Sequence, residues 1–395
     1  MKVDLETSLR ERFRRPAVVH EWLTIPGGSE KVVLEVLRML PGADIFTSVY
    51  EPEQWREALD GHHVHTSFLN GIPGAGRHYP KLLPLMNRAF ESFDLAGYDL
   101  VVSSSHSCAK NVLTGPDTLH VCYCHTPMRH AWEPRLLEGE LGGAGRLIAR
   151  SLLPRLRRDD LIGSVRPDVY IANSAFVARR IAKFYRRDAE VVHPPVEVDR
   201  FLSIPRDPQD YYLVMGRVVP YKRVDLAVAA CARLGRKVKV VGAGRALDAA
   251  RAAAGPDAEF LGHVPDEQLG ELLSGARALL FCGLEDFGIV PVEAQAAGVP
   301  VIAYGAGGVL DSVIDGRTGL LFGEQTVESV AEAIRAFERA EFDEKAIRDN
   351  ARRFSPERFR AELARVIGEQ HDRFRAEGKQ GFRADRNNIP EVGVR

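Results

Sequence analysis

Two glutamates eight residues apart, Glu285 and Glu293, flank a predicted helix start in the stretch EDFGIVPVE. The amides at a helix N-terminus, here those of Gly288, Ile289 and Val290, form an anion site suited to phosphate oxygens. Glu293 would reach groups beside a phosphate, such as ribose hydroxyls, and Glu285 would accept hydrogen bonds from sugar hydroxyls. The alternative is a carboxylate that complements the helix dipole and a second one that is solvated in a loop.

Local signals place these residues between a strand and a helix. The run ARALLFCG (276–283) is predicted to form a buried strand, and the loop that contains Glu285 follows its carboxyl end. Pro291 suits the first helical position, and Gly298 suits the helix end. Gly288 would let the backbone approach a ligand closely.

Two cations follow another predicted strand, in LVMGRVVPYKR. Arg217 comes directly after Gly216, and Lys222 is predicted to begin a helix. Together they would neutralise a diphosphate and stabilise it as a leaving group. Ordinary surface charge is the alternative.

The N-terminal half offers a second set of candidates. Gly27 and Gly28 precede a predicted helix in PGGSEKVV, and His125 ends a predicted strand in CYCHTPMRHAWE. A simple strand-to-helix turn and a hydrogen-bonded core histidine are the respective alternatives. Further candidates for substrate contact, with ordinary structural roles as the alternative, are Arg129, His130, Trp132, His106 and Lys110.

Short β-branched runs alternate with helical patterns through most of the chain, which predicts βαβ units with parallel sheets. Expected strands span 16–23, 43–50, 98–105, 119–125, 168–174, 189–196, 211–217, 237–242, 258–264, 276–283, 299–305 and 319–322. A polar, proline-containing stretch at 197–210 reads as a linker. The expected fold class is therefore α/β, with two doubly wound Rossmann-like domains facing a cleft. Their expected bounds are 1–200 and 208–355, with a helix at about 356–378 that packs back on the first domain.

Composition narrows the function classes. The chain has 395 residues, is 45% hydrophobic and carries a net charge of -1, so nothing demands a nucleic-acid partner. Five cysteines fit buried thiols in a reducing compartment, and Cys122, Cys124 and His125 lack a second pair at zinc spacing, so no metal is expected. No apolar run is long enough to span a membrane, and no signal-type core follows the N-terminus. A soluble cytoplasmic protein is expected, with a frayed tail from about Glu377.

Other nucleotide-binding motifs do not fit. Gly242 and Gly244 follow a strand in VVGAGRA but lack the third glycine of a dinucleotide fingerprint. The chain has no P-loop. It also has no D-x-D sequence, which argues against a metal-dependent diphosphate site.

Several of these segments, in this order, resemble the retaining family-4 glycosyltransferases of GT-B fold. The family's E-x7-E signature reads EDFGIVPVE here, and FLGHVPDEQL resembles the loop that meets the nucleotide base. The resemblance covers most of residues 15–370. It implies a catalytic set of His125, Glu285, Arg217 and Lys222. It implies donor-binding residues at Gly27, Gly28, Gly216, Arg217, Lys222, His263, Val264, Glu285, Phe287, Gly288, Ile289, Val290 and Glu293.

Within that family, four segments resemble those of a mannosyltransferase-like subgroup of O-antigen and exopolysaccharide synthesis. They are HEWL, GGSEKV, SSSHSCAK and CHTPMRHAW. This implies the transfer of a hexose to a lipid-linked or oligosaccharide acceptor without a cofactor. The favoured hexose is mannose, and the favoured donor is GDP-mannose. The alternatives are a UDP-sugar-dependent glucosyl or GlcNAc transferase, an epimerase or phosphorylase, sucrose- or trehalose-type synthesis, and a non-catalytic sugar-nucleotide-binding subunit.

Arginines cluster with leucines in GRLIARSLLPRLRRDD (145–160). A basic, partly amphipathic segment of this kind binds anionic lipid head groups. The sequence therefore suggests peripheral contact with the inner face of the cell membrane, and a solvated helix face is the alternative.

Overall fold

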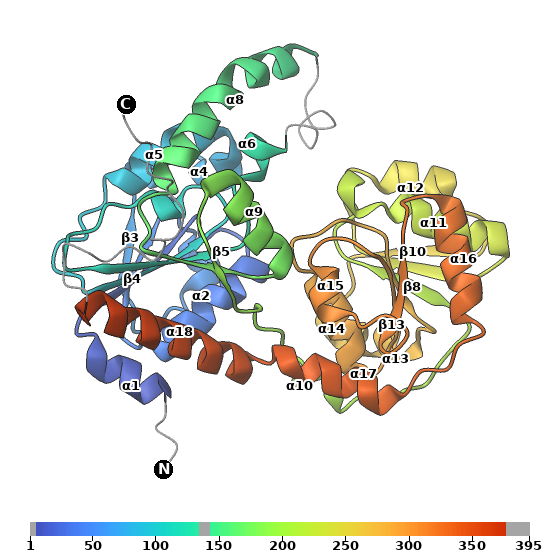
Figure 1. Cartoon of the computed structure of the whole chain (residues 1–395). Coiled ribbons are helices and arrows are strands. Elements are labelled where there is room, and N and C mark those ends of the chain that lie inside the picture. Colours follow the sequence, from blue (N-terminus) through green and yellow to red (C-terminus); the bar gives the residue numbers. More distant parts are fainter. Residues whose placement is uncertain (1–4, 134–142, 377–395) are drawn as a thin grey trace, which may run out of the picture. The chain divides into compact units, whose positions relative to one another are not determined.

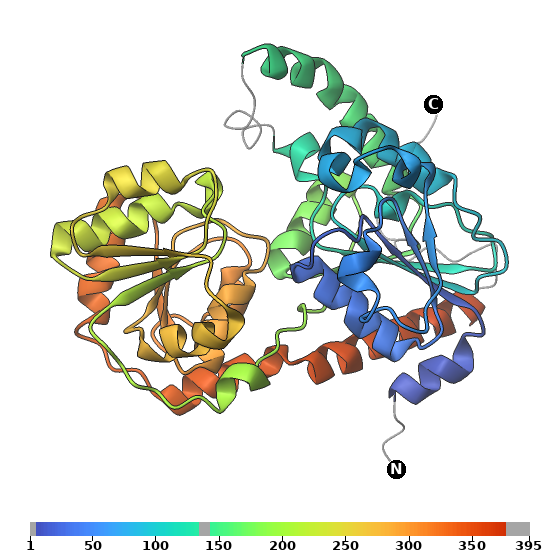
Figure 2. The same ribbon diagram turned by 180° about the vertical axis from the view of Figure 1, so that it is seen from behind.

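The computed structural model describes residues 5–133 and 143–376, and the predicted frayed tail lies outside them. The chain divides into two compact units, Met1–His193 with Phe359–Arg395, and Pro194–Arg358. Each unit contains one parallel sheet with helices on both faces (Figures 1 and 2). The predicted fold class, α/β with two doubly wound sheets, is confirmed.

The first unit is built on a seven-stranded sheet in the order β3-β2-β1-β4-β5-β6-β7. Its strands are β1 Pro16–His20, β2 Asp44–Thr47, β3 Val64–Thr66, β4 Leu100–Ser105, β5 Leu119–Cys124, β6 Val169–Ala172 and β7 Glu190–Val191. The strand order reverses between β1 and β4, which pair in parallel with Val18 opposite Val102. In such sheets ligands bind outside the carboxyl ends of the strands at this reversal.

Helices cover both faces of this sheet. On one face lie α1 Leu5–Arg12, α2 Gly28–Met39 and α18 Pro356–Ala376. On the other lie α5 Leu83–Glu91, α6 Arg129–Trp132, α8 Gly143–Gly163 and α9 Ala175–Tyr185. Shorter turns are α3 Pro52–Trp55, η1 Phe68–Gly71, α4 Ala75–His78, η2 Tyr79–Leu82 and η3 Ala109–Asn111.

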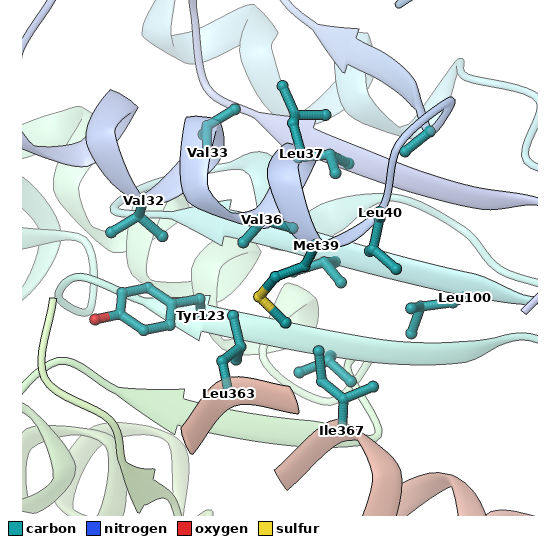
Figure 3. Close-up of a cluster of buried hydrophobic side chains, with 14 of the residues drawn as sticks. Val32, Val33, Val36, Leu37, Met39, Leu40, Leu100, Tyr123, Leu363 and Ile367 are labelled. Carbon is teal, nitrogen blue, oxygen red and sulfur yellow. The ribbon is translucent and has the colours of Figure 1, made fainter. Parts of the chain in front are cut away.

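Helix α18 packs on the first unit although it follows the second in sequence. Ser355 caps it, and Pro356 is its first residue. Figure 3 shows Leu363 and Ile367 of α18 against side chains of α2 and the sheet, and both are fully buried. Arg360 adds ion pairs to Glu6 and Glu35.

The second unit has a six-stranded sheet in the order β10-β9-β8-β11-β12-β13. Its strands are β8 Tyr212–Met215, β9 Val238–Val241, β10 Ala258–Gly262, β11 Leu279–Phe281, β12 Val301–Tyr304 and β13 Gly319–Phe322. All six fall inside the predicted ranges. Here the reversal lies between β8 and β11.

Two helical layers cover this second sheet. One contains α10 Asp199–Leu202, α13 Asp266–Gly275, α14 Ile289–Ala296, α15 Val309–Ser312 and α17 Glu344–Ala351. The other contains α11 Val224–Leu234, α12 Leu247–Ala253 and α16 Val327–Phe337. The 3-10 turns of this unit are η4 Pro220–Lys222 and η5 Arg352–Phe354.

The stretch 197–210 is not the plain linker that its polarity predicted. Val198 and Phe201 are buried in the core of the second unit, and α10 lies within it. The side chain of Arg348 then ties α10 to α14: its guanidinium donates to the carbonyls of Leu202 at 3.0 Å and Ala296 at 2.8 Å. Two buried apolar side chains therefore outweigh the polar composition of the stretch. None of the helices described here combines the length and hydropathy that a membrane span requires.

Candidate active site

In the second unit, the predicted cations and carboxylate lie at the carboxyl ends of the two strands where the order reverses. Arg217 and Lys222 follow β8, and Glu285 follows β11. The Nζ of Lys222 lies 2.9 Å from Oε1 of Glu285, and both side chains are more than four-fifths buried. The residue assigned to a diphosphate and the residue assigned to a sugar thus form one ion pair.

Helix α14 presents free amides beside this pair. It begins at Ile289, two residues before the predicted start, so Pro291 is its third residue and Glu293 begins its second turn rather than lying in the first. A proline is tolerated there because the first amides of a helix have no intrahelical acceptor. The amides of Gly288, Ile289 and Val290 donate to no other residue in the described chain. They remain available to an anion.

The loop that carries Glu285 is fixed by two glycines whose role the sequence did not reveal. The amide of Gly308 donates to the carbonyl of Glu285 at 2.8 Å. A Cβ on Gly308 would lie 2.1 Å from the carbonyl oxygen of Asp286, and one on Gly307 would lie 2.5 Å from that of Glu285. The backbones meet so closely that only glycine fits.

The glycines of VVGAGRA serve the neighbouring loop in the same way. A Cβ on Gly242 would lie 2.0 Å from the carbonyl oxygen of Gly216, and one on Gly244 would lie 2.3 Å from that of Val218. Both glycines also have positive φ angles. They therefore hold the loop of Arg217, whose side chain is exposed, with Nη2 3.5 Å from the hydroxyl of Tyr221. Lys222 ends a 3-10 turn, and α11 begins two residues later, so Lys222 does not begin a helix as predicted.

The predicted base-binding residues lie between β10 and α13. His263 is exposed and Val264 is buried, and both line a hollow of about 730 Å³ with Tyr211, Lys239 and Gln268 among its other walls. The ring of Phe287, by contrast, is buried 5.5 Å from that of Phe354. Phe287 thus anchors the loop that carries Glu285, and only its backbone is left for a ligand.

In the first unit, His125 follows β5 directly, as predicted. Its amide donates to the carbonyl of Ser105 at 2.8 Å, and its carbonyl accepts from Asn173 at 3.0 Å. Burial, with smaller effects from His106 and His20, lowers the pKa of His125 to about 3. The imidazole is therefore neutral at ordinary pH.

The predicted glycine loop of this unit opens α2. Gly27 is the N-cap, and Gly28 is the first helical residue rather than the one before it. A Cβ on Gly27 would lie 3.0 Å from Oε2 of Glu30. The loop thus lies directly beside a carboxylate in the first turn of the helix.

Two of the weaker candidates serve the interior instead. Trp132 donates its indole N–H to Asp160 at 2.6 Å, and its ring stacks on Phe184 at 4.8 Å. Lys110 is fully buried and pairs with the same Asp160. Asp160 therefore ties α8 to the rest of the unit, and both residues have partners within it.

A buried carboxylate that the sequence did not single out organises the loop SSSHSC. Glu21 accepts from the amides of His106 at 3.1 Å, Ser107 at 2.7 Å and Cys108 at 2.9 Å. Burial raises the pKa of Glu21, but His106 and the backbone amides outweigh it and the net shift is downward. The protein's own anion fills this nest of amides, so the loop is not a phosphate site. The one feature of the sequence that could have pointed to Glu21 is its position directly after β1.

Comparisons with known proteins cover both units of the chain. Residues 26–200 match the family model described as Glycosyltransferase Family 4, and residues 197–354 match the model described as Glycosyl transferases group 1. The two matches together span residues 26–354, most of the chain.

Curated relatives are similar over part of their length. A protein of Streptomyces scabiei (strain 87.22), described as D-inositol 3-phosphate glycosyltransferase, is 35% identical over 189 residues, 39% of this chain and 42% of that protein. One with the same description from Geodermatophilus obscurus is 34% identical over 226 residues, 48% of this chain and 50% of that protein. The matched part thus spans half or less of these relatives.

Solved structures share the fold. Anabaena Alr3699/HepE in complex with UDP and glucose has a TM-score of 0.62 at 16% identity, covering 90% of this chain and 100% of that one. The apo form of the lipopolysaccharide outer core galactosyltransferase WaaB has a TM-score of 0.64 at 16% identity, with the same coverage. At this identity the likeness establishes the architecture alone.

Proposed function

Because the chain belongs to the glycosyltransferases described by these two family models, we propose that it transfers a hexose from a nucleotide sugar to a hydroxyl acceptor. The observation that carries the proposal is the Lys222–Glu285 pair beside the free amides that begin α14. A cation and amides suit a diphosphate, and a carboxylate suits the hydroxyls of the sugar joined to it.

The proposed mechanism assigns one task to each group. Arg217, Lys222 and the α14 amides hold the diphosphate and stabilise it as it leaves. Glu285 orients the sugar by accepting from its hydroxyls, and Glu293 accepts from the ribose. The bond between the anomeric carbon and the phosphate oxygen breaks, and a bond to the acceptor oxygen forms on the same face, with retention. The acceptor's proton passes to the leaving phosphate oxygen.

The favoured donor is GDP-mannose and the favoured acceptor a lipid-linked or oligosaccharide hydroxyl in cell-surface polysaccharide synthesis, with no metal required. The support for this donor is the resemblance of the HEWL, GGSEKV and CHTPMRHAW segments. Two solved structures of one neighbour, Anabaena Alr3699/HepE, hold UDP, and the curated relatives are described as D-inositol 3-phosphate glycosyltransferases. The test therefore includes UDP-sugars and a phosphorylated polyol.

The test is thermal-shift titration of the full chain with GDP-mannose, UDP-glucose, UDP-GlcNAc, GDP and UDP. Wild type is compared with Arg217→Ala and with Arg233→Ala, which removes an exposed arginine of α11 that pairs with Glu328. Hydrogen bonds from a charged donor contribute about 1.5–3 kcal/mol, so Arg217→Ala should weaken binding of one nucleotide sugar roughly 10- to 150-fold. Arg233→Ala should leave binding unchanged.

Transfer is then measured with the stabilising donor and three acceptors: D-inositol 3-phosphate, a polyprenyl-linked saccharide and a soluble oligosaccharide. Retention predicts a product with the same anomeric configuration as the donor, read by NMR of the product. Donor binding without transfer to any acceptor would favour the non-catalytic subunit, and equal binding by wild type and Arg217→Ala would refute the diphosphate site.

We also propose peripheral contact with an anionic membrane. Helix α8 contains the arginine-rich segment 145–160, and its described side chains include the exposed Arg155, Arg158, Leu161 and Ile162. Basic and apolar side chains exposed together suit the interface of an anionic bilayer. Co-sedimentation with phosphatidylglycerol vesicles but not phosphatidylcholine vesicles, lost in Arg155→Glu/Arg158→Glu, is expected, and equal sedimentation with both vesicles would contradict it.

A further inference from the structure

The ion pair between Lys222 and Glu285 joins the two halves of the proposed donor site. Nζ of Lys222 lies 2.9 Å from Oε1 of Glu285, and the two side chains are 15% and 19% exposed. The proposed mechanism assigns the lysine to the diphosphate and the glutamate to the sugar. One cation must therefore serve two anions, and both residues belong to the second unit.

Two glycines fix the position of Lys222. A Cβ on Gly283 would lie 2.8 Å from Cα of Lys222, and a Cβ on Gly216 would lie 3.0 Å from its Nζ. Gly283 comes after β11 and Gly216 after β8, so the lysine packs against both strand ends because neither glycine has a side chain. The main chain of Lys222 is thus held beside Glu285, and a change of partner can be made only by its side chain.

Glu285 depends on this cation. Its Oε1 is shielded from solvent, and apart from the ion pair with Lys222 it accepts no hydrogen bond within the described chain. A buried charge that loses its partner is costly, because no water replaces the lost interaction. A diphosphate that draws Lys222 toward itself therefore leaves Oε1 of Glu285 poorly compensated.

The same geometry brings two negative charges close together. A phosphate oxygen that accepts from a lysine lies about 2.8 Å from the lysine nitrogen. Because Oε1 of Glu285 is 2.9 Å from the same nitrogen, the two anions would lie within about 6 Å of each other. Repulsion between two unit charges at that distance changes an equilibrium constant roughly 3- to 100-fold, from water-like to surface-like screening.

The sugar of an intact donor offsets this repulsion. Its hydroxyls donate hydrogen bonds, and an ionised carboxylate only accepts them. Such charge-assisted hydrogen bonds are stronger than those between neutral groups. A nucleoside diphosphate has the same diphosphate but brings no sugar hydroxyls to Glu285, so it meets the repulsion without the compensation.

We propose that Glu285, by sharing Lys222 with the diphosphate, weakens the binding of the nucleoside diphosphate relative to that of the nucleotide sugar. The inference rests on the proposed function and gives Glu285 a second task besides orientation of the sugar. After transfer the sugar has left with the acceptor, and the nucleoside diphosphate remains beside a carboxylate that no hydroxyl compensates. Glu285 thereby promotes release of this product.

Isothermal titration calorimetry of the full chain with GDP, GDP-mannose, UDP and UDP-glucose tests the inference. Glu285→Gln keeps the shape of the side chain and removes its charge. It should bind the nucleoside diphosphate roughly 3- to 100-fold more tightly than wild type does, and the nucleotide sugar no more tightly. Glu285→Ala, which also removes the charge, should show the same gain. A nucleoside diphosphate that binds both variants no better than wild type would overturn the inference.

Two further variants separate the charge of Glu285 from other effects. Glu285→Asp keeps a carboxylate and should bind the nucleoside diphosphate no more tightly than wild type does. Glu338→Gln removes the same charge from a similarly buried ion pair, in which Oε1 of Glu338 lies 2.7 Å from Nε of Arg236. Glu338 also accepts from the hydroxyl of Tyr212, the first residue of β8, whereas Lys222 follows the last. Tighter binding by either variant would show that the local charge of Glu285 is not the cause.

Product inhibition of transfer gives a second readout. The inhibition constant of the nucleoside diphosphate should fall in Glu285→Gln by the same factor as its Kd. If wild type binds the nucleotides and Glu285→Gln shows no gain, this inference alone is refuted. If wild type binds none of the four nucleotides, the proposed function fails and this inference fails with it.

Discussion

At the scale of single residues, the Lys222–Glu285 pair links binding to stability. In Lys222→Met, Glu285 would keep its burial and lose its cation, and an unpaired buried charge costs at least about 1–3 kcal/mol. We expect a lower free energy of unfolding by urea together with weaker binding of the nucleotide sugar. Lys222→Arg keeps the charge and should lose less of both, and a Lys222→Met variant that binds as wild type does would remove Lys222 from the donor site.

His120 makes a pH-dependent contribution to stability. It is fully buried, and burial, with a smaller effect from Arg166, lowers its pKa to about 3, against 6.5 for an ordinary histidine. Between these values the unfolded chain binds a proton that the folded chain excludes, so stability falls as the pH drops below about 6.5. The slope from one such group reaches about 1.4 kcal/mol per pH unit.

Urea unfolding at pH 7.5, 6.5 and 5.5 measures this slope. His120→Asn should flatten the dependence even though it lowers stability at pH 7.5. The exposed His63, replaced by Asn, serves as the control and should leave the slope unchanged. An unchanged slope in His120→Asn would mean that His120 does not titrate differently in the two states.

At the scale of elements, the conformation of the loop that carries Glu285 depends on how closely a neighbouring loop approaches it. In Gly308→Ala the new Cβ would meet the carbonyl of Asp286, and forcing atoms into a packed region costs about 1–3 kcal/mol. We expect the loop of Glu285 to shift and nucleotide affinity to fall with the melting temperature. Gly323→Ala is the control, because no atom lies within 4 Å of the added carbon, and equal effects of the two changes would contradict the close-packing explanation.

Strands and candidate site residues could be predicted from the sequence where the residues that reveal them are neighbours along the chain. All strands except β3 lie within predicted ranges, because they fall in short runs rich in apolar residues. Strand β3 is three residues long, and two of them are exposed. Arg217, Lys222 and Glu285 were singled out because polar residues that follow buried strands stand out. Glu21 was missed because its partners depend on which strands become neighbours, and no local pattern gives that order.

At the scale of the whole molecule, the first unit requires a helix that is distant in sequence. Removing buried methylenes costs about 2–5 kcal/mol for a change such as Ile367→Ala. Because Ile367 packs on α2 and the first sheet, hydrogen exchange should rise in β1 and β4 and stay unchanged in β8 and β11. Arg373→Ala, an exposed change on the same helix, should alter neither, and faster exchange throughout both sheets would show that the units unfold together.

The late position of α18 also sets an order of events during synthesis. Residues 194–358 emerge from the ribosome as one uninterrupted stretch and have all their core partners at that moment. The first 193 residues emerge earlier, yet Leu363 and Ile367 are still untranslated. At roughly 5–20 residues per second, the nascent first unit waits on the order of ten to thirty seconds with part of its apolar surface uncovered. The half that is made first is therefore completed last, and this interval is when the chain most needs a chaperone.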